Sequence, residues 1–245
     1  DLHSFPTRRS SDLWQMPMAR DLSIDLDAVG GAVTERTKMV VVCNPNNPTG
    51  TVVKKGAFDR LLGALASLPR APLFVLDQAY VDYMPAEDED AIDVKAVLLA
   101  HGNVVALRTF SKMSGLAGLR VGYAIARPEV ISHMYRVRPP YTVNALAQLA
   151  ALVDVTDRSV QAFKAEVSSG VAEERRKLEA FFAASGVRYV PSRANFVFAF
   201  FDRPYEDLKD LSEALEERGI LVRLLVHEAG PCLPKIGRAS CRERV

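Results

Sequence analysis

The chain contains 245 residues, 49% of them hydrophobic and 25% charged, and its formal net charge is +1. This composition is typical of a soluble protein with one or two domains, and a near-neutral charge without a basic stripe argues against a nucleic-acid surface. No apolar run is long enough to span a bilayer. The three cysteines, Cys43, Cys232 and Cys241, lack the C-x-x-C spacing of zinc sites and show no disulfide framework. We therefore expect a protein of a reducing compartment, the cytoplasm.

Both ends of the chain differ in character from the rest. Residues 1–13 (D-L-H-S-F-P-T-R-R-S-S-D-L) lack the apolar core of a signal peptide, and residues 236–245 (I-G-R-A-S-C-R-E-R-V) form a basic stretch without periodicity. Both resemble translated cloning or sequencing adaptor, and the alternative is a pair of disordered natural tails. We predict non-family tails at residues 1–21 and 236–245 and leave them out of the expected fold.

From residue 22 to about residue 140, short apolar runs alternate with helical patterns. Residues 38–43 (K-M-V-V-V-C), for example, form a continuous apolar run bounded by turn formers, which is typical of a buried parallel strand. Polar residues follow the strands at their C-terminal ends, where parallel α/β sheets bind their ligands. The expected strands are 22–27, 38–43, 73–76, 104–107 and 121–126, the expected helices are 28–34, 58–68 and 94–100, and residues 87–90 are expected to form a solvated acidic loop.

After Pro139 and Pro140 the pattern changes to longer helices and short strands. The expected helices are 144–155, 160–184 and 205–218, and the expected strands are 187–190, 195–201 and 220–225. Gly186 and Gly219 follow two of these helices, where glycines often form the C-cap. The sequence therefore predicts a mostly parallel α/β sheet domain over residues 22–140 and a smaller α+β domain over residues 141–235.

Three motifs follow three of the expected strands. The first is N-P-N-N-P-T-G at residues 44–50, and the second is D-Q-A-Y at residues 77–80. The third, R-T-F-S-K-M-S-G-L-A-G-L-R-V-G-Y at residues 108–123, combines hydroxyls, a lysine, small residues and an arginine. Glycines allow close backbone approach and an arginine can bind a phosphate through two hydrogen bonds, so this segment suits a lysine held beside a phosphorylated cofactor.

Together these motifs resemble those of fold-type-I pyridoxal-phosphate enzymes, and among them the class I/II aminotransferases. The forms T-F-S-K-M-S-G-L-A-G-L-R-V-G-Y and D-Q-A-Y-V-D-Y are most similar to histidinol-phosphate aminotransferases and their close relatives. The resemblance implies that the cofactor is pyridoxal 5'-phosphate. It also implies that residues 22–140 are an incomplete large domain and that residues 141–235 are part of the small domain.

The resemblance assigns a role to each motif residue. Lys112 would form a Schiff base with the cofactor and move protons as a general acid and base, and Asp77 would keep the pyridine nitrogen protonated. Tyr80 and Asn47 would donate hydrogen bonds to the phenolate oxygen of the cofactor. By themselves, Asp77 could instead cap a helix and Tyr80 could be a half-buried aromatic. The residues implied to bind the phosphate are Ser111 and Arg120, with Thr109 as a weaker third.

One further residue is implied to contact the substrate. The run G-I-L-V-R at residues 219–223 is similar to a family strand whose arginine lies at the substrate end of the site. Arg223 is therefore our candidate for an anionic substrate group, and the alternative is a surface arginine on an edge strand.

The resemblance implies an enzyme that transfers an amino group between an amino acid or amino-alcohol phosphate and a 2-oxo acid, as in histidine biosynthesis. Its partners would be these small molecules, without nucleic acid or membrane, and the parent enzyme would be a homodimer. The alternatives are a lyase or decarboxylase of the same cofactor class, such as a threonine-phosphate decarboxylase, and a non-catalytic truncated domain. The resemblance covers residues 22–225 and lacks the family's upstream phosphate loop and downstream L-R-I-x-x-G strand, so we expect a fragment that binds cofactor weakly and turns over poorly.

Overall fold

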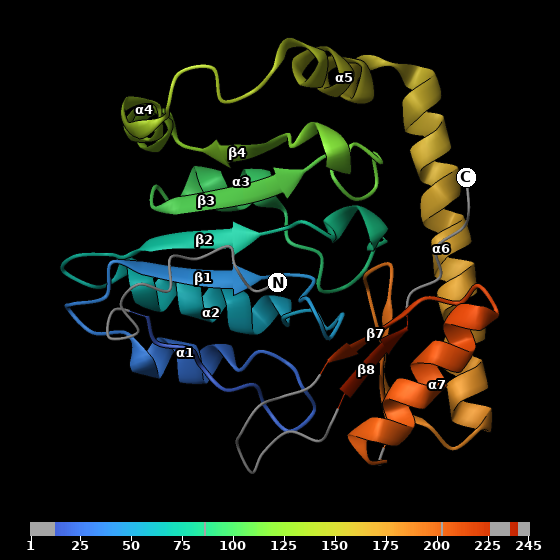
Figure 1. Ribbon diagram of the computed structural model, residues 1–245. Coiled ribbons are helices and arrows are strands. Elements are labelled where there is room, and N and C mark those ends of the chain that lie inside the picture. The colour runs from blue at the N-terminus through green and yellow to red at the C-terminus, as the bar shows by residue number, and fades with distance from the viewer. Residues whose placement is uncertain (1–12, 86, 202, 226–235, 240–245) are drawn as a thin grey trace.

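A computed structural model of the chain describes residues 13–85, 87–201, 203–225 and 236–239 (Figure 1). Its first sheet has the strand order β1-β2-β3-β4, and β1, β2 and β3 are parallel. These strands are β1 (Met39–Cys43), β2 (Leu73–Asp77), β3 (Val104–Thr109) and β4 (Gly122–Ala126). Strand β4 is antiparallel to β3, because residues 110–121 turn back through a short 3₁₀ helix, η3 (Ala117–Leu119), without a helical crossover. The expectation of a mostly parallel sheet flanked by helices is confirmed.

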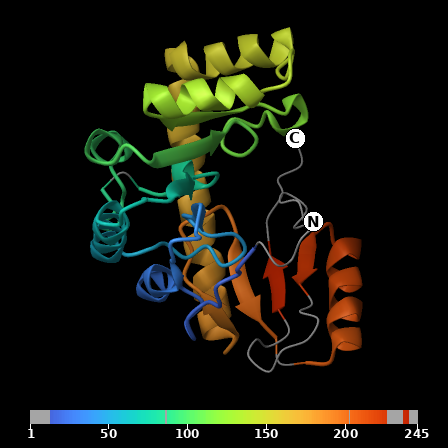
Figure 2. The same cartoon turned by 90° about the vertical axis from the view of Figure 1, so that its left-hand side faces the viewer.

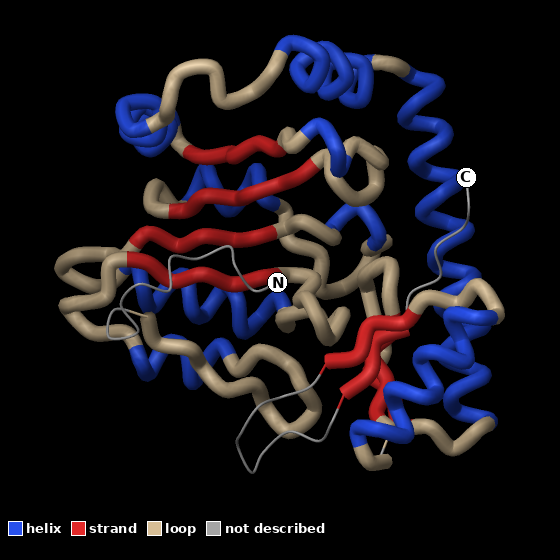
Figure 3. The backbone as a smooth tube through the Cα atoms, viewed as in Figure 1, coloured by secondary structure: helices blue, strands red, loops and turns tan. Residues whose placement is uncertain are grey.

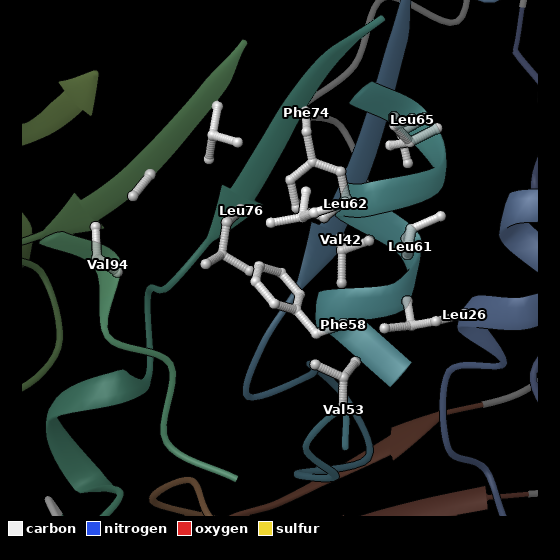
Figure 4. Close-up of a cluster of buried hydrophobic side chains, with 13 residues drawn as sticks. Leu26, Val42, Val53, Phe58, Leu61, Leu62, Leu65, Phe74, Leu76 and Val94 are labelled. Atoms are coloured by element: carbon white, nitrogen blue, oxygen red, sulfur yellow. The ribbon is translucent and has the colours of Figure 1, made fainter. Parts of the chain in front are cut away.

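Three helices cover one face of this sheet. They are α1 (Leu26–Ala32), α2 (Lys55–Ala66) and α3 (Val94–Ala100). Helix α2 places Phe58, Leu61, Leu62 and Leu65 at the spacing of one helical face, and all four are buried against alternate residues of the strands (Figure 4). Phe58 meets Phe74 of β2 edge to face, with ring centroids 5.6 Å apart.

The opposite face of β1 is open. Val40 and Val42 are buried in the core, whereas Met39 and Val41 are 50% and 42% exposed. The apolar run at residues 38–43 predicted a buried strand, and β1 is buried on one face.

Three helices, the last of them long, connect the first sheet to the second. They are α4 (Pro128–Val137), α5 (Ala145–Thr156) and α6 (Arg158–Ala184). Ala147 of α5 packs on Phe110 and Val121, and α6 then runs along the side of the molecule to the second sheet (Figure 1). The corner between α5 and α6 is held by Asp154, a buried carboxylate 2.9 Å from the amine of Lys164.

The second sheet is antiparallel throughout and has the order β5-β6-β8-β7. Its strands are β5 (Arg188–Val190), β6 (Val197–Phe200), β7 (Val222–Leu225) and β8 (Ile236–Ala239). Helix α6 packs on β6 through Phe182, and α7 (Tyr205–Glu217) packs beside β7 (Figure 2). Figure 3 shows the two sheets as separate groups of strands. Residues 236–239, which the expected fold left out, form the strand between β6 and β7.

Three further sequence predictions differ from the structure. Residues 22–27 do not form a strand, because Leu22 has a positive φ of 63° and Asp25 caps α1 by accepting a hydrogen bond from the Ala28 amide. Helix α4 was not expected, and none of its residues is buried. The acidic loop at residues 87–90 is not solvated throughout, since Asp90 is 6% exposed.

Within the described ranges, no helix has the length and apolarity needed to cross a bilayer. Much of the two predicted tails and the end of the small domain lies outside the described residues, as do Cys232 and Cys241.

Candidate active site

The candidate site lies at the carboxyl ends of β1, β2 and β3, on the right-hand side of the first sheet in Figure 1. The parallel register places Cys43 beside Asp77 and Asp77 beside Leu107, so the loops that follow the three strands start next to each other. Backbone hydrogen bonds continue this register, from the Asn44 amide to the Asp77 carbonyl (2.8 Å) and from the Gln78 amide to the Leu107 carbonyl (2.9 Å).

Three of the predicted site residues meet here, one from each loop. The side-chain amide of Asn47 donates a hydrogen bond to the Tyr80 hydroxyl, with an Nδ2–Oη distance of 3.1 Å. The amine of Lys112 lies 5.1 Å from the centroid of the Tyr80 ring, within the range of a cation–π contact. Tyr80 is 3% exposed, whereas Lys112 and Asn47 are exposed. The exposed Lys112 therefore lies against the ring of Tyr80, whose hydroxyl is bonded to Asn47.

The ring of Tyr80 is held in place by residues distant in the sequence. Phe196, just before β6, packs on it edge to face with the centroids 5.2 Å apart. Met113, which follows Lys112 directly, is buried in the same cluster with Tyr83. The hydroxyl of Ser168 on α6 also donates to the Asp82 carbonyl (3.2 Å) in η2 (Val81–Tyr83). Sequence reasoning did not find Phe196, which reads locally as an ordinary strand-forming residue.

Asp77 is the last residue of β2, and its side chain is half-buried. Its Oδ1 accepts a hydrogen bond from the Ala79 amide (3.0 Å). Burial and the neighbouring charge of Asp77 raise the pKa of the Cys43 thiol to about 11. The alternative reading of Asp77 as a helix cap does not hold, because the residue at the N-cap of the following η2 is Tyr80.

The predicted phosphate ligands lie at the end of β3 and in the loop between β3 and β4. Thr109 accepts a hydrogen bond from the Ser111 amide at its Oγ1 (3.0 Å). Arg120 is exposed, adopts a left-handed φ of 53°, and donates from Nη1 to the Ala117 carbonyl (2.9 Å). Non-glycine residues in this conformation store strain and cluster at ligand sites. Among the described residues, the hydrogen bonds of Ser111 and Arg120 reach Thr109 and Ala117 and do not include Asn47, Tyr80 or Lys112.

Arg223 is exposed on β7. Its β-ladder partner is Arg238 of β8. Among the interactions of the described residues, none links Arg223 to Lys112 or Tyr80.

Two residues of the acidic loop, which was expected to be solvated, have buried side chains that make hydrogen bonds. Asp90 accepts from the Lys54 amine (2.7 Å) and from the Lys55 amide (3.0 Å) at the start of α2. Asp88 accepts from Nε of Arg193 at 2.6 Å, and its side chain is 7% exposed. The partners Lys54 and Arg193 lie 36 and 105 positions away in the sequence. The acidic composition of the loop does not reveal such distant partners, and it therefore suggested a solvated loop.

Comparison with known proteins identifies the family. A family model described as aminotransferase class I and II matches residues 8–241. The chain belongs to this aminotransferase family. The resemblance drawn from its three motifs is thus confirmed.

Individual class I and II aminotransferases are similar over most of the chain. The histidinol-phosphate aminotransferase of Moorella thermoacetica is 44% identical over 204 residues, which are 83% of this chain and 50% of that protein. The aromatic amino acid aminotransferase of Nocardia farcinica is 42% identical over 209 residues, 85% of this chain and 56% of that protein. The crystal structure of histidinol-phosphate aminotransferase from Sinorhizobium meliloti in complex with pyridoxal-5'-phosphate is 28% identical, with a TM-score of 0.75 over 93% of this chain and 59% of that one. The chain spans about half the length of the curated relatives it matches.

Proposed function

We propose that this site binds pyridoxal 5'-phosphate and belongs to an enzyme that transfers an amino group between an amino substrate and a 2-oxo acid. The observation that carries the proposal is the meeting of the Lys112 amine with the Asn47–Tyr80 pair at the carboxyl edge of the sheet. Three residues from separate loops supply an accessible amine and two polar donors within one small region.

The donor set fits this cofactor. When bound, pyridoxal phosphate supplies an aldehyde that accepts the amino group and a ring that withdraws electrons from the reacting carbon. Lys112 is the amine that would hold it covalently and then move protons as a general acid and base. The half-buried Asp77 carboxylate would favour the protonated ring nitrogen, and Asn47 and Tyr80 would donate to the ring oxygen. The phosphate would be held by Ser111 and Arg120, with Thr109 as a weaker ligand.

For the substrate, we propose an amino-alcohol phosphate such as histidinol phosphate, which would place the enzyme in histidine biosynthesis. The name of the Moorella relative supports this choice, whereas the name of the Nocardia relative supports an aromatic amino acid. An anionic phosphate group requires a positive partner, and Arg223 is our candidate for it. The parent enzyme would act as a homodimer in the cytoplasm, with a 2-oxo acid as the second substrate.

Covalent trapping tests this proposal on the chain as it exists. The chain is mixed with pyridoxal phosphate, reduced with borohydride and digested, and mass spectrometry locates the pyridoxyl group. We expect modification concentrated at Lys112 and abolished by Lys112→Ala, with Lys95→Ala, a change at an exposed lysine of α3, as the matched control. Modification spread over the surface lysines, or unchanged in Lys112→Ala, would overturn the proposal.

The reaction is tested by supplying histidinol phosphate or phenylalanine with 2-oxoglutarate. Release of glutamate supports transamination, and the preferred amino donor selects the substrate class. Steady release of CO2 would instead indicate a decarboxylase. Equal behaviour of the wild-type and Lys112→Ala chains in every assay would indicate a non-catalytic domain.

A further inference from the structure

The loop between β5 and β6 contacts two loops of the first sheet beside the candidate site. The amide of Arg193 donates to the Gly50 carbonyl (2.8 Å), and Nε of Arg193 donates to Asp88 (2.6 Å). Arg193 therefore binds both the Asn-rich loop (residues 44–50) and the acidic loop (residues 87–90), which lie more than 100 positions before it in the sequence.

These contacts are partly buried, and one of them depends on a residue without a side chain. Asp88 is 7% exposed, while Arg193 is 42% exposed. Burial opposes the charge of Asp88, but the hydrogen bond from Arg193 and other favourable contacts outweigh it and lower the pKa of the carboxyl. Gly50 has a φ of 75°, and a Cβ at this position would lie 2.1 Å from Oγ of the buried Ser192. The Asn-rich loop can approach Ser192 this closely because residue 50 has no side chain.

Only a few residues separate these contacts from Asn47 and Tyr80 of the candidate site. Gly50 lies three residues after Asn47, and the turn between them is closed by a hydrogen bond from the Gly50 amide to the Asn46 carbonyl (2.8 Å). On the other side, Phe196 lies three residues after Arg193 and packs on Tyr80. The 191–196 loop thus supports both Asn47 and its hydrogen-bond partner Tyr80.

We propose that Asp88 and Arg193 are positioning residues, which hold the Asn-rich loop so that the Asn47 amide is aimed at the cofactor ring. This inference rests on the proposed function, because it assigns Asn47 to cofactor binding. Neither residue needs to touch the cofactor. Their effect is to reduce the number of positions that the Asn47 side chain can occupy, and a donor held in position loses less freedom when the ligand binds.

The first test measures the dissociation constant of pyridoxal phosphate by absorbance titration of the full chain. Asp88→Asn and Arg193→Gln should each weaken binding by roughly two- to tenfold, the range expected for impairment of one hydrogen bond. Arg60→Gln is the matched control, because Arg60 is 64% exposed and pairs with Asp27 on the surface. Unchanged affinity in both variants would refute the positioning role, even where Lys112 is still modified as the proposed function requires.

A double-mutant cycle separates positioning from a general loss of structure. In an Asn47→Ala background, Arg193→Gln should weaken binding clearly less than it does in the wild-type chain, because the Asn47 amide is absent and only the support of Tyr80 through Phe196 remains. An undiminished effect in that background would contradict the proposal. Hydrogen exchange without cofactor provides a readout that does not depend on the proposed function: amides of residues 44–51 should exchange faster in both variants, and unchanged exchange there would also refute the role of Asp88 and Arg193.

Discussion

The thiol of Cys43 offers a direct probe of the charge at Asp77. Its pKa is raised from 9.0 to about 11, first by burial and second by the carboxylate of Asp77 on the neighbouring strand. Because thiolate is the reactive form, a rise of this size lowers the reactive fraction near pH 8 by roughly 100-fold. In a Cys232→Ser, Cys241→Ser background, alkylation of folded chain by iodoacetamide should be slower than that of urea-unfolded chain by at least this factor.

Replacing Asp77 by Asn removes the charge while keeping a side chain of similar size. The thiol pKa should then fall, and alkylation should become faster by up to roughly tenfold, since burial remains as the larger cause of the shift. The matched control is Asp82→Asn, which removes a carboxylate of η2 that does not contribute to the Cys43 pKa. Far-UV circular dichroism and urea midpoints verify that each variant is folded.

A specific outcome would refute this reasoning. If Asp77→Asn leaves the alkylation rate of Cys43 unchanged in a folded chain, the carboxylate does not act on the end of β1. It would then not lie at the shared edge of the sheet where the proposed cofactor site requires it.

Two other predictions concern stability. Phe58→Ala should lower the free energy of unfolding by about 3–5 kcal/mol in urea titrations, because it empties the contact with Phe74 in the core, whereas Phe163→Ala, at a 61% exposed position, should change it by less than about 1 kcal/mol. Burial first, and nearby charges second, raise the pKa values of Cys43 to about 11 and of Tyr83 to about 12. The folded state therefore keeps protons that the unfolded chain releases, so stability should fall as pH rises from about 9, by roughly 2–3 kcal/mol for Cys43. A urea midpoint unchanged between pH 8 and pH 11 would contradict this, and Cys43→Ala should flatten the decline.

Patterns that depend on neighbouring residues predicted most of the fold. Helix α3 begins and ends at the predicted residues, and α5 begins directly after Asn144, whose side chain accepts a hydrogen bond from the Ala147 amide. The expected strand at residues 22–27 does not form, because Asp25 caps α1 and this capping signal competes with the apolar alternation of the segment. Helix α4 was not predicted, although Pro128 lies at its start and Val130, Ile131, Met134 and Tyr135 follow helical spacing.

In the candidate site, too, the residues with a local sequence signal could be predicted and those that depend on distant contacts could not. Asn47, Tyr80 and Lys112 could be predicted because each lies in a motif that follows a strand, and parallel strands bring their carboxyl ends to one edge. The partners that support them could not be predicted, because Phe196 and Arg193 carry no local signal of their distant contacts. Asp88 shows the consequence, since its acidic neighbours suggested solvent while its actual partner lies 105 positions away.

Gly50 meets both a local requirement, the turn, and a distant one, the close approach of Ser192. Its place in N-P-T-G marks a turn, and a φ of 75° agrees with the freedom that glycine has there. A turn could also accept asparagine at positive φ, so the local pattern does not require glycine. The contact with Ser192 does require it, because any Cβ would overlap the hydroxyl and also approach the Ser192 Cα to 3.1 Å. The identity of residue 50 therefore follows from the packing of two loops that the sequence places 142 positions apart, and this packing is what links the second sheet to Asn47.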